Sequence, residues 1–242
     1  MGVGVRATRR LAADSRNGLL SMNSLDQLSS DIRACRICVE QPLRKPLPHG
    51  PRPILQVSST ARICICGQAP GTRVHESGRP FTDRSGDRLR EWLGLDHETF
   101  YDPAQIAIIP MGFCFPGQNE KGSDLPPRPE CRARWHDDLF ASMPKIELLL
   151  TIGQYAIAYH LGADRKKTLT ETVGAWRDYW YDREHPTGTP RIMPLPHPSW
   201  RNNAWIKKNL WFEQEQLPVL RQQITRILDE SRSDLPIESA PR

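Results

Sequence analysis

The stretch "RICICGQAPG" at residues 62–71 joins a short apolar run to a loop of glycine, proline and small residues. Residues 63–66 contain only Ile and Cys, which is typical of a strand that is buried on both faces of a sheet. Cys64 and Cys66 point to the same face of such a strand and are expected to pack there as small hydrophobes. The sequence therefore predicts a buried strand that ends at Gly67 in a tight loop.

Three further apolar runs are predicted to be strands, at residues 105–111, 146–153 and 191–196. Residues 24–35 are predicted to form a short helix that Ser24 and Gln27 begin as a capping box. The other predicted helices occupy residues 84–95, 128–142, 153–161, 170–181 and 209–230. Strands that alternate with helices favour an α/β fold with a parallel sheet covered on both faces, whose ligands bind beyond the carboxyl ends of the strands.

The length and charge of the chain favour one globular domain. The 242 residues carry 33 Lys and Arg against 28 Asp and Glu, so a net charge of +5 is compatible with a polyanionic partner without requiring one. We expect one domain over residues 23–230, a disordered tail over 1–22 and a second tail over 231–242. The first 22 residues lack the apolar core of a secretory signal, and no run of 18 apolar residues predicts a membrane span.

The loops that follow three of the predicted strands have unusual sequences: "GQAPG" (67–71), "PMGFCFPG" (110–117) and "PHPSWRN" (196–202). We infer that these three loops build one pocket. His197 lies between Pro196 and Pro198, which restrict the backbone and so aim the imidazole. The alternative to such a functional role is a structural one, in which His197 only forms hydrogen bonds with backbone groups at the end of the strand.

Four of the six cysteines form two pairs outside the first strand. Cys35 and Cys38 form a C-x2-C pair, whereas Cys114 and Cys131 are separated by 16 residues. A C-x2-C pair can hold one edge of a metal ion or a cluster, but structural zinc usually has a second short pair. Because the chain shows no secretion signal, disulfides are not expected. The residues alone leave a cluster, zinc and free thiols open.

The segment "GQAPGTRVHESGRPFTDRSGDRL" (67–89), the four cysteines in this order and "LPHPSWRNN" (195–203) together resemble the uracil-DNA glycosylase superfamily, nearest its iron–sulfur branches. The resemblance covers about residues 31–229. It implies a three-layer α/β/α sandwich with a central four-stranded parallel sheet. It also implies a DNA repair enzyme, a uracil-DNA glycosylase, which flips uracil out of DNA and hydrolyses its N-glycosidic bond to leave an abasic site.

The resemblance further implies partners and a cofactor. The implied partners are uracil-containing DNA and free uracil as the product, and no membrane partner is expected. The protein is expected to be a monomer in the cytoplasm that associates with the nucleoid through DNA. The cofactor is a [4Fe–4S] cluster. Its implied ligands are Cys35, Cys38, Cys114 and Cys131.

The resemblance assigns roles to the residues of the motifs. His197 matches the histidine that donates a hydrogen bond to uracil O2 as negative charge develops there. Phe81 matches the ring that stacks on the flipped base, although a core Phe is the alternative. Ser199 matches a phosphate contact, and Arg201 matches the residue that enters the duplex, with an exposed solvated Arg as the alternative. Backbone groups that approach the substrate closely are expected from Gly67, Ala69, Pro70 and Gly71.

The sequence departs from the family pattern where water is activated. Many relatives carry a carboxylate at the start of the first motif, where Gln68 and Ala69 stand here. Gln68 can position water but cannot take its proton. We expect Asp83 to activate water or stabilise the sugar cation, with an N-cap of the following helix as the alternative. Two further candidates for a functional role in this segment are His75, which is expected to contact substrate, and Glu76. The alternative for both is a position on the polar face of a loop.

A second departure concerns recognition of the base. Iron–sulfur relatives usually read the edge of uracil with an Asn four residues before the third cysteine, and that position is Pro110 here. Since proline has no side-chain donor, we expect backbone groups of Met111 and Gly112 to read the base. Gln118 and Asn119 are nearby candidates for the same role.

Two other functions fit parts of the sequence. A non-catalytic iron–sulfur protein that binds DNA or senses redox state would keep the cysteines but would not need the fixed His197. A glycosylase that stays covalently bound to the abasic product would use a histidine in a basic insertion after the first motif. His75 lies near that region, but residues 67–83 contain no long basic insertion.

Overall fold

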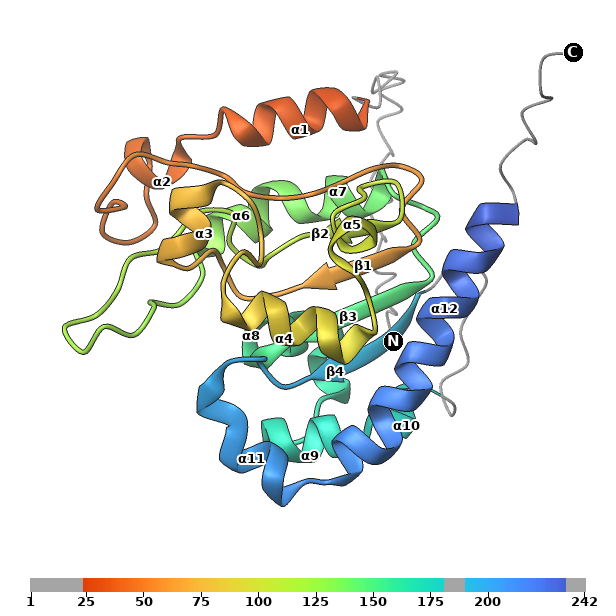
Figure 1. The fold of residues 1–242 in the computed structure, drawn as a ribbon. Coiled ribbons are helices and arrows are strands. Elements are labelled where there is room, and N and C mark those ends of the chain that lie inside the picture. The colour runs from red at the N-terminus through yellow and green to blue at the C-terminus, as the bar shows by residue number, and fades with distance from the viewer. Residues whose placement is uncertain (1–23, 181–189, 234–242) are drawn as a thin grey trace, which may run out of the picture.

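The computed structural model describes residues 24–180 and 190–233, so the expected tail over 1–22 lies outside the described residues. Four parallel strands form one sheet in the order β2-β1-β3-β4, as Figure 1 shows. Their bounds are β1 Ile63–Cys66, β2 Ile106–Ile108, β3 Leu148–Ile152 and β4 Arg191–Leu195. The predicted four-stranded parallel sheet is confirmed.

The strands are apolar because both faces of the sheet are covered. Every residue of β1, β2 and β3 is buried, and only Arg191 is exposed in β4. Cys64 and Cys66 are fully buried, with their Sγ atoms 3.7 Å apart on one face of β1. This confirms the core role expected for these two cysteines.

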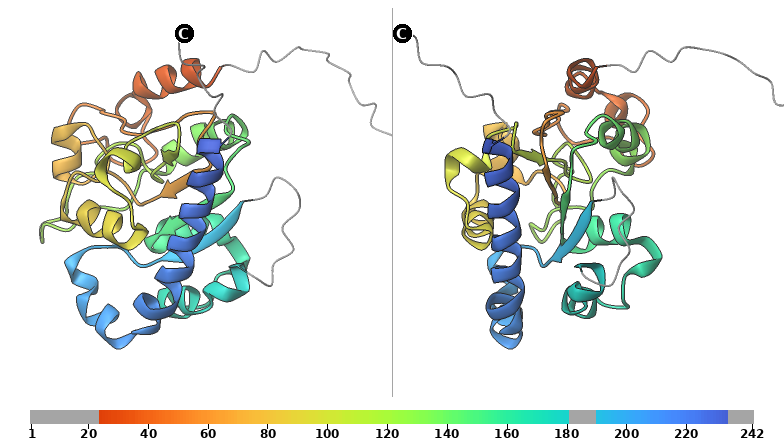
Figure 2. Two further views of the ribbon diagram at one scale, coloured as in Figure 1. Left: turned by 45° about the vertical axis from the view of Figure 1, so that its right-hand side comes forward. Right: turned by 90° about the vertical axis from the view of Figure 1, so that its right-hand side faces the viewer.

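Helices lie on both faces of the sheet and complete three layers, most clearly in the edge-on view of Figure 2. One face carries α4 (Arg84–Leu93) and α12 (Leu217–Ser233), which pack on each other. The other carries α1 (Leu25–Arg33), α7 (Asp137–Ala141), α8 (Gly153–Leu161), α9 (Leu169–Gly174) and α10 (Trp176–Trp180). Within the described ranges, no helix combines the length and the apolar character that crossing a membrane requires.

Several predicted helices are interrupted. The helix predicted over 170–181 is divided at Ala175 into α9 and α10. The helix predicted over 128–142 consists of α6 (Pro129–Cys131), a π-helical turn over Arg132–His136, and α7. A second π-helical turn, Phe212–Gln216, precedes α12. Pro218 lacks the N–H that would continue a regular helix, which accounts for the wider turn at this point.

Short elements escaped prediction because they span too few residues for a helical period to be recognised. They are α2 (Ile37–Glu40), α3 (Thr72–Ser77), α5 (His97–Phe100), α11 (Asn203–Lys208) and two 3₁₀ turns, Gly162–Asp164 and Trp200–Asn202. Of these, α3 directly follows the first loop expected to build the pocket, and the turn Trp200–Asn202 lies within the third.

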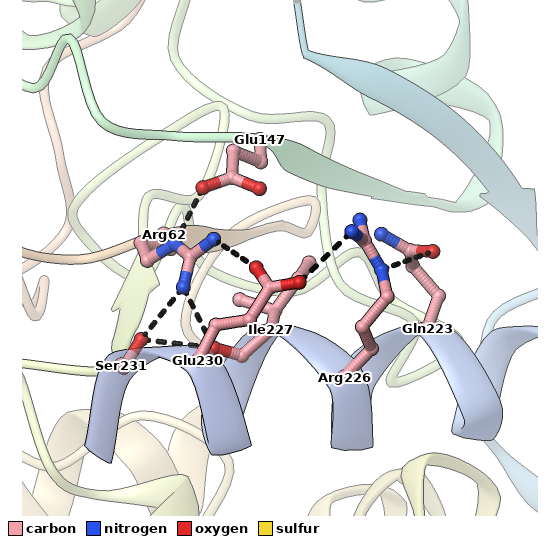
Figure 3. A network of polar contacts seen from close by, with 7 residues as sticks. All are labelled: Arg62, Glu147, Gln223, Arg226, Ile227, Glu230 and Ser231. Atoms are coloured by element: carbon pink, nitrogen blue, oxygen red, sulfur yellow. Dashed lines mark hydrogen bonds and ion pairs between the residues drawn. The ribbon is translucent and has the colours of Figure 1, made fainter. Parts of the chain in front are cut away.

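The amino ends of the strands are joined to α12 by a polar network around Arg62, drawn in Figure 3. The Arg62 guanidinium contacts the carboxylate of Glu147 just before β3 and that of Glu230 on α12, the latter at 2.7 Å. It also donates to the Ile227 carbonyl at 2.9 Å and to Ser231 Oγ at 3.2 Å. Arg62 thus connects three segments that are far apart in the sequence.

Candidate active site

A cavity of about 100 Å³ lies beyond the carboxyl ends of β1 and β2. It is lined by the glycine-rich loop after β1, by the Phe81 ring and by His197 after β4. Its other walls are apolar at Ile54, Val74, Pro80, Ile108 and Pro110, and polar at Gln68, Asp83, Ser85 and Asp124. The structure therefore brings residues of the three strand-end loops into one pocket, which we call the base pocket.

A wider cavity of about 660 Å³ adjoins the base pocket, and we call it the groove. Both cavities are lined by Gln68, Ala69, Asp83, Ser85, Asp124 and His197. The groove adds three exposed arginines, Arg73, Arg84 and Arg201, and the predicted contact Ser199. Arg73 and Arg84 were missed in the sequence, although both flank the motif residues. The base pocket thus opens into a groove whose charge suits a phosphate backbone.

Backbone hydrogen bonds hold the glycine-rich loop in place. The Met111 N–H donates to the Gly67 carbonyl at 2.9 Å, and the Gly112 N–H donates to the Gln68 carbonyl at 3.0 Å. These bonds extend the pairing of β1 with β2 past the ends of both strands. They also occupy the two N–H groups that were expected to read a base, and neither Met111 nor Gly112 lines the base pocket or the groove.

Phe81 enters the base pocket from an unusual backbone conformation. Its φ of +54° is rare for an aromatic residue, and its carbonyl accepts hydrogen bonds from Tyr101 Oη at 3.0 Å and Arg90 Nη1 at 3.2 Å. A Cβ on Gly67 would lie 3.4 Å from the tip of the Phe81 ring, and one on Gly86 would collide with the Phe81 carbonyl. Glycine at position 86 is therefore required by the backbone of Phe81, whereas Gly67 is in van der Waals contact with its ring.

His197 follows β4 and lines both cavities. Its carbonyl accepts a hydrogen bond from Asn202 Nδ2 at 2.6 Å. Arg88 on α4 holds the same loop by donating to the Ser199 carbonyl at 3.2 Å and to Asn203 Oδ1 at 2.7 Å. The two prolines restrict the backbone, and these bonds fix the loop against α4. Sequence reasoning missed the roles of Asn202, Asn203 and Arg88.

Burial lowers the pKa of His197 below the ordinary value for histidine. The carboxylates of Asp83 and Asp124 oppose this effect by raising the pKa, and Arg201 adds to it. Desolvation is the largest of these effects, so the imidazole is neutral at pH 7. A neutral imidazole can donate one hydrogen bond from its N–H.

Asp83 caps a helix and also lines the site. Its Oδ1 accepts a hydrogen bond from the Gly86 N–H at 3.1 Å, which makes it the N-cap of α4. The residue also lines the base pocket and the groove. The cap fixes the carboxylate at the mouth of the pocket.

Asp124 is a pocket residue that sequence reasoning missed. It lies in the loop of residues 117–125, and its Oδ1 accepts a hydrogen bond from Gln118 Nε2 at 3.1 Å. Gln118 itself lines the groove, whereas the Asn119 side chain accepts from the N–H groups of Lys121 and Ser123 in its own turn. No motif in the sequence marked Asp124, because only the folded loop brings it to the pocket.

His75 lies elsewhere. Its ring centroid is 4.4 Å from that of His49 and 5.8 Å from that of Phe115, and it lines neither the base pocket nor the groove. Arg52 donates to the carbonyls of His75 and Glu76 and so ties α3 to the connector before β1. His75 thus packs against other rings and Glu76 is exposed, and neither residue lines the cavities where a site position was expected.

The loop after His197 forms one wall of the groove. Ser199, Trp200 and Arg201 all line it. Trp200 is 71% exposed, and the Arg201 guanidinium lies 5.8 Å from the centroid of its ring. An exposed Trp beside an Arg offers flat surfaces on which bases can stack.

The four cysteines outside β1 come together on the side of the molecule that carries α2 and α6. Cys38 and Cys114 pack in one buried cluster with Leu47. The Phe113 N–H donates to Cys131 Sγ at 3.4 Å, and interaction with the Cys131 thiol lowers the pKa of Cys38 to about 7. Burial raises the pKa of Cys114 to about 12, with nearby Cys38 and Cys35 adding to the rise.

Among the described residues, no three His, Cys, Asp or Glu side chains form a group that could hold a single metal ion. In a [4Fe–4S] cluster, by contrast, each thiolate binds a different iron, so the four sulfurs need not converge on one point. The mutual proximity of four soft donors, with a backbone N–H aimed at one sulfur, fits a cluster better than a lone ion.

Comparisons with known proteins agree with this geometry. The family model for the uracil DNA glycosylase superfamily matches residues 55–221. A curated relative, the type-4 uracil-DNA glycosylase of Saccharolobus solfataricus, is 23% identical over 191 residues, which is 74% of this chain and 77% of the relative. The residues matched by the family model include the parallel sheet, the groove and every residue of the base pocket except Ile54. The chain therefore belongs to the uracil-DNA glycosylase superfamily and is a DNA glycosylase.

Proposed function

We propose that the protein is a uracil-DNA glycosylase that flips uracil out of DNA and hydrolyses its N-glycosidic bond. The observation that carries this proposal is the shared pocket of His197, Phe81 and the Gly67 loop, which opens into a groove lined by arginines. A pocket of this kind takes a base out of the duplex while the groove holds the phosphates. Uracil as the base is supported by the activity named for the type-4 relative. Such an enzyme acts where the DNA is, in the cytoplasm at the nucleoid.

The binding step uses Phe81 and the groove. The Phe81 ring offers its face to the extruded base, and stacking is worth roughly 1–3 kcal/mol per base. Arg73 and Arg84 attract the phosphates on one side of the pocket, and Ser199 contacts a phosphate on the other. Arg201, beside the exposed Trp200, occupies the place left by the flipped nucleotide.

The chemical step uses His197. As the N-glycosidic bond breaks, its electron pair moves to the departing uracil, and negative charge gathers at O2 while the sugar becomes cationic. The neutral imidazole donates its N–H to O2 from a position fixed before the reaction, so little reorganisation is needed. The carboxylate of Asp83 at the mouth of the pocket stabilises the sugar cation.

The edge of the base is read by side chains. Pro110 lines the base pocket but has no donor, and the Met111 and Gly112 N–H groups are already bonded. Gln68 presents an amide to the pocket, with both a donor and an acceptor. Its Nε2 donates to the Leu125 carbonyl at 3.2 Å, which leaves Oε1 to accept the N3–H of uracil.

The cofactor of the proposed enzyme is a [4Fe–4S] cluster held by Cys35, Cys38, Cys114 and Cys131. When bound, such a cluster joins the segments that carry its ligands by metal–sulfur bonds. The Phe113 N–H stabilises the negative charge on the Cys131 sulfur, and it belongs to the loop that pairs with Gly67. The cysteines thereby support one wall of the active site.

The test is incubation of the purified protein with a uracil-containing oligonucleotide, followed by alkali and denaturing electrophoresis. Strand cleavage after alkali supports base release. A slowly migrating protein–DNA band would support covalent capture, and an unchanged substrate would support a non-catalytic DNA-binding protein. The cluster is tested separately, because a loaded protein is brown and absorbs broadly near 400 nm. A colourless protein loaded with zinc would contradict the cluster.

A further inference from the structure

We propose that Asp124 is the catalytic base that takes the proton of the attacking water, a role that rests on the proposed glycosylase function. When a base occupies the pocket and its backbone lies in the groove, the N-glycosidic bond spans the border between the two cavities. Six residues line both cavities and therefore lie at that border. The carboxylates among these six are Asp83 and Asp124.

The two carboxylates have different surroundings, which suit them to different roles. Asp83 is fixed to the first turn of α4 through the Gly86 N–H, so its carboxylate is part of the helix cap. Asp124 lies in an exposed loop, where solvent reaches it, and is oriented by Gln118 through a single side-chain bond. The carboxylate that solvent reaches is the better placed of the two to receive a proton from water.

The loop that carries Asp124 is ordered by its own bonds. Gln118 and Asp124 form a β-bridge, and the Leu125 N–H donates to the Gly117 carbonyl at 2.9 Å. Gln68 Nε2 attaches this loop to the glycine-rich loop by donating to the Leu125 carbonyl. Gln68, which cannot accept a proton, thus holds in place the residue that can.

The Asp124 carboxylate lies against the glycine-rich loop. A Cβ at Gly71 would lie 3.4 Å from Asp124 Oδ2, which is van der Waals contact. The negative charge of Asp124 raises the pKa of His197, so the carboxylate lies near the imidazole. Both residues line the base pocket and the groove. The two groups therefore act on one substrate.

The proposed step breaks one bond to C1′ and forms another. The N1–C1′ bond breaks, and its electron pair leaves with uracil as the anion whose O2 accepts from His197. A lone pair of the water oxygen forms the new bond to C1′, and a water proton passes to Asp124. The products are the abasic sugar and the uracil anion, which takes up a proton and restores the starting charge when Asp124 releases its own.

The test compares Asp124→Asn with Glu120→Gln, which removes the same charge from the same loop at a residue outside both cavities. Single-turnover release is measured on oligonucleotides with uracil, hypoxanthine or xanthine, and DNA affinity is measured by fluorescence anisotropy. We expect Asp124→Asn to release the base about 100-fold more slowly, within the 10²–10⁴ range for proton transfer. Its DNA affinity should be unchanged. Glu120→Gln should release the base at a near-normal rate. A loss smaller than tenfold would overturn the role of Asp124.

A second variant separates catalysis from loop structure. Asp124→Glu keeps a carboxylate on the same loop at the mouth of the pocket, and we expect its rate to exceed that of Asp124→Asn at least tenfold. Equal rates for the two variants would overturn proton transfer by Asp124. If the unmodified protein releases another base but not uracil, the proposed substrate fails while Asp124 is still tested on that base. Release of no base at all would overturn both.

Discussion

The two ends of the parallel sheet carry polar residues in opposite arrangements. At the amino end, the Arg62 guanidinium is 16% exposed and has carboxylate partners before β3 and on α12, so its charge is neutralised within the protein (Figure 3). At the carboxyl end, His197, Asp83 and Asp124 face a cavity and hold few internal hydrogen bonds. The amino end joins the layers, whereas the carboxyl end leaves its polar groups for a ligand.

The carboxyl end also stores backbone strain. Phe81 has a positive φ, a conformation that costs roughly 1–3 kcal/mol for residues other than glycine. Hydrogen bonds from Tyr101 and Arg90 to its carbonyl compensate for part of this cost. The difference between the two ends indicates that substitutions should affect stability at one end and catalysis at the other.

The largest effect is expected for His197→Ala at the carboxyl end. Loss of a fixed donor to the leaving group typically lowers the rate about 10²–10³-fold, and DNA affinity should be retained because Phe81 and the arginines of the groove are unchanged. Single-turnover release of uracil and anisotropy with the same oligonucleotide measure the two quantities. Near-normal turnover would remove His197 from the mechanism.

At the amino end, Arg62→Met should lower the free energy of unfolding by about 2 kcal/mol, because it leaves several partners without their hydrogen bonds. The rate of uracil release at 25 °C should stay within about twofold of the parent protein, since this end is remote from the pocket. Urea unfolding and single-turnover kinetics provide the measurements.

Arg226→Met is the matched control for this substitution. Arg226 is exposed and contacts only the outer part of the same network, through Glu230 and Gln223. Its loss should change stability by no more than about 0.5 kcal/mol. Equal effects of the two substitutions would show that Arg62 has no special place at the amino end.

Acid should destabilise the fold through His136, whose ring lies 5.4 Å from Phe113 beneath the carboxyl-end loops. Burial lowers its pKa to about 4, so between pH 4 and 6.5 the unfolded chain binds more protons than the folded protein, and stability falls as the pH falls. From pH 7 to pH 5 this one group should cost about 2 kcal/mol.

His136→Phe should therefore reduce the loss of stability between pH 7 and pH 5 by about that amount. The midpoint of urea unfolding at the two pH values, for the parent protein and the variant, measures it. The same loss in both proteins would assign the acid sensitivity to other groups.

The smallest effect is expected for Arg201→Ala in the groove. If the guanidinium fills the place of a flipped nucleotide, release from duplex DNA should fall about tenfold, or about 1.4 kcal/mol, and release from a single strand should fall less. Lys208→Ala, an exposed residue of α11 outside both cavities, is the control. Equal losses of rate on the two substrates would show that Arg201 only attracts phosphates.

The sequence by itself determined the elements that depend on local patterns. The apolar runs predicted four buried strands, all confirmed, because a strand covered on both faces tolerates few polar residues. Alternation with helices predicted a parallel sheet, and the three loops after the strands predicted where a pocket would lie. His197 between two prolines could be recognised because proline restricts the backbone wherever it occurs.

Only the tertiary structure decided which groups remain available at the site. Backbone N–H groups of Met111 and Gly112 are used by the loop beside them, and His75 packs against His49 and not in the pocket. Asp124 reaches the pocket from a loop with no motif of its own. These outcomes depend on contacts between segments far apart in the chain, and local propensity and spacing carry no information about such contacts.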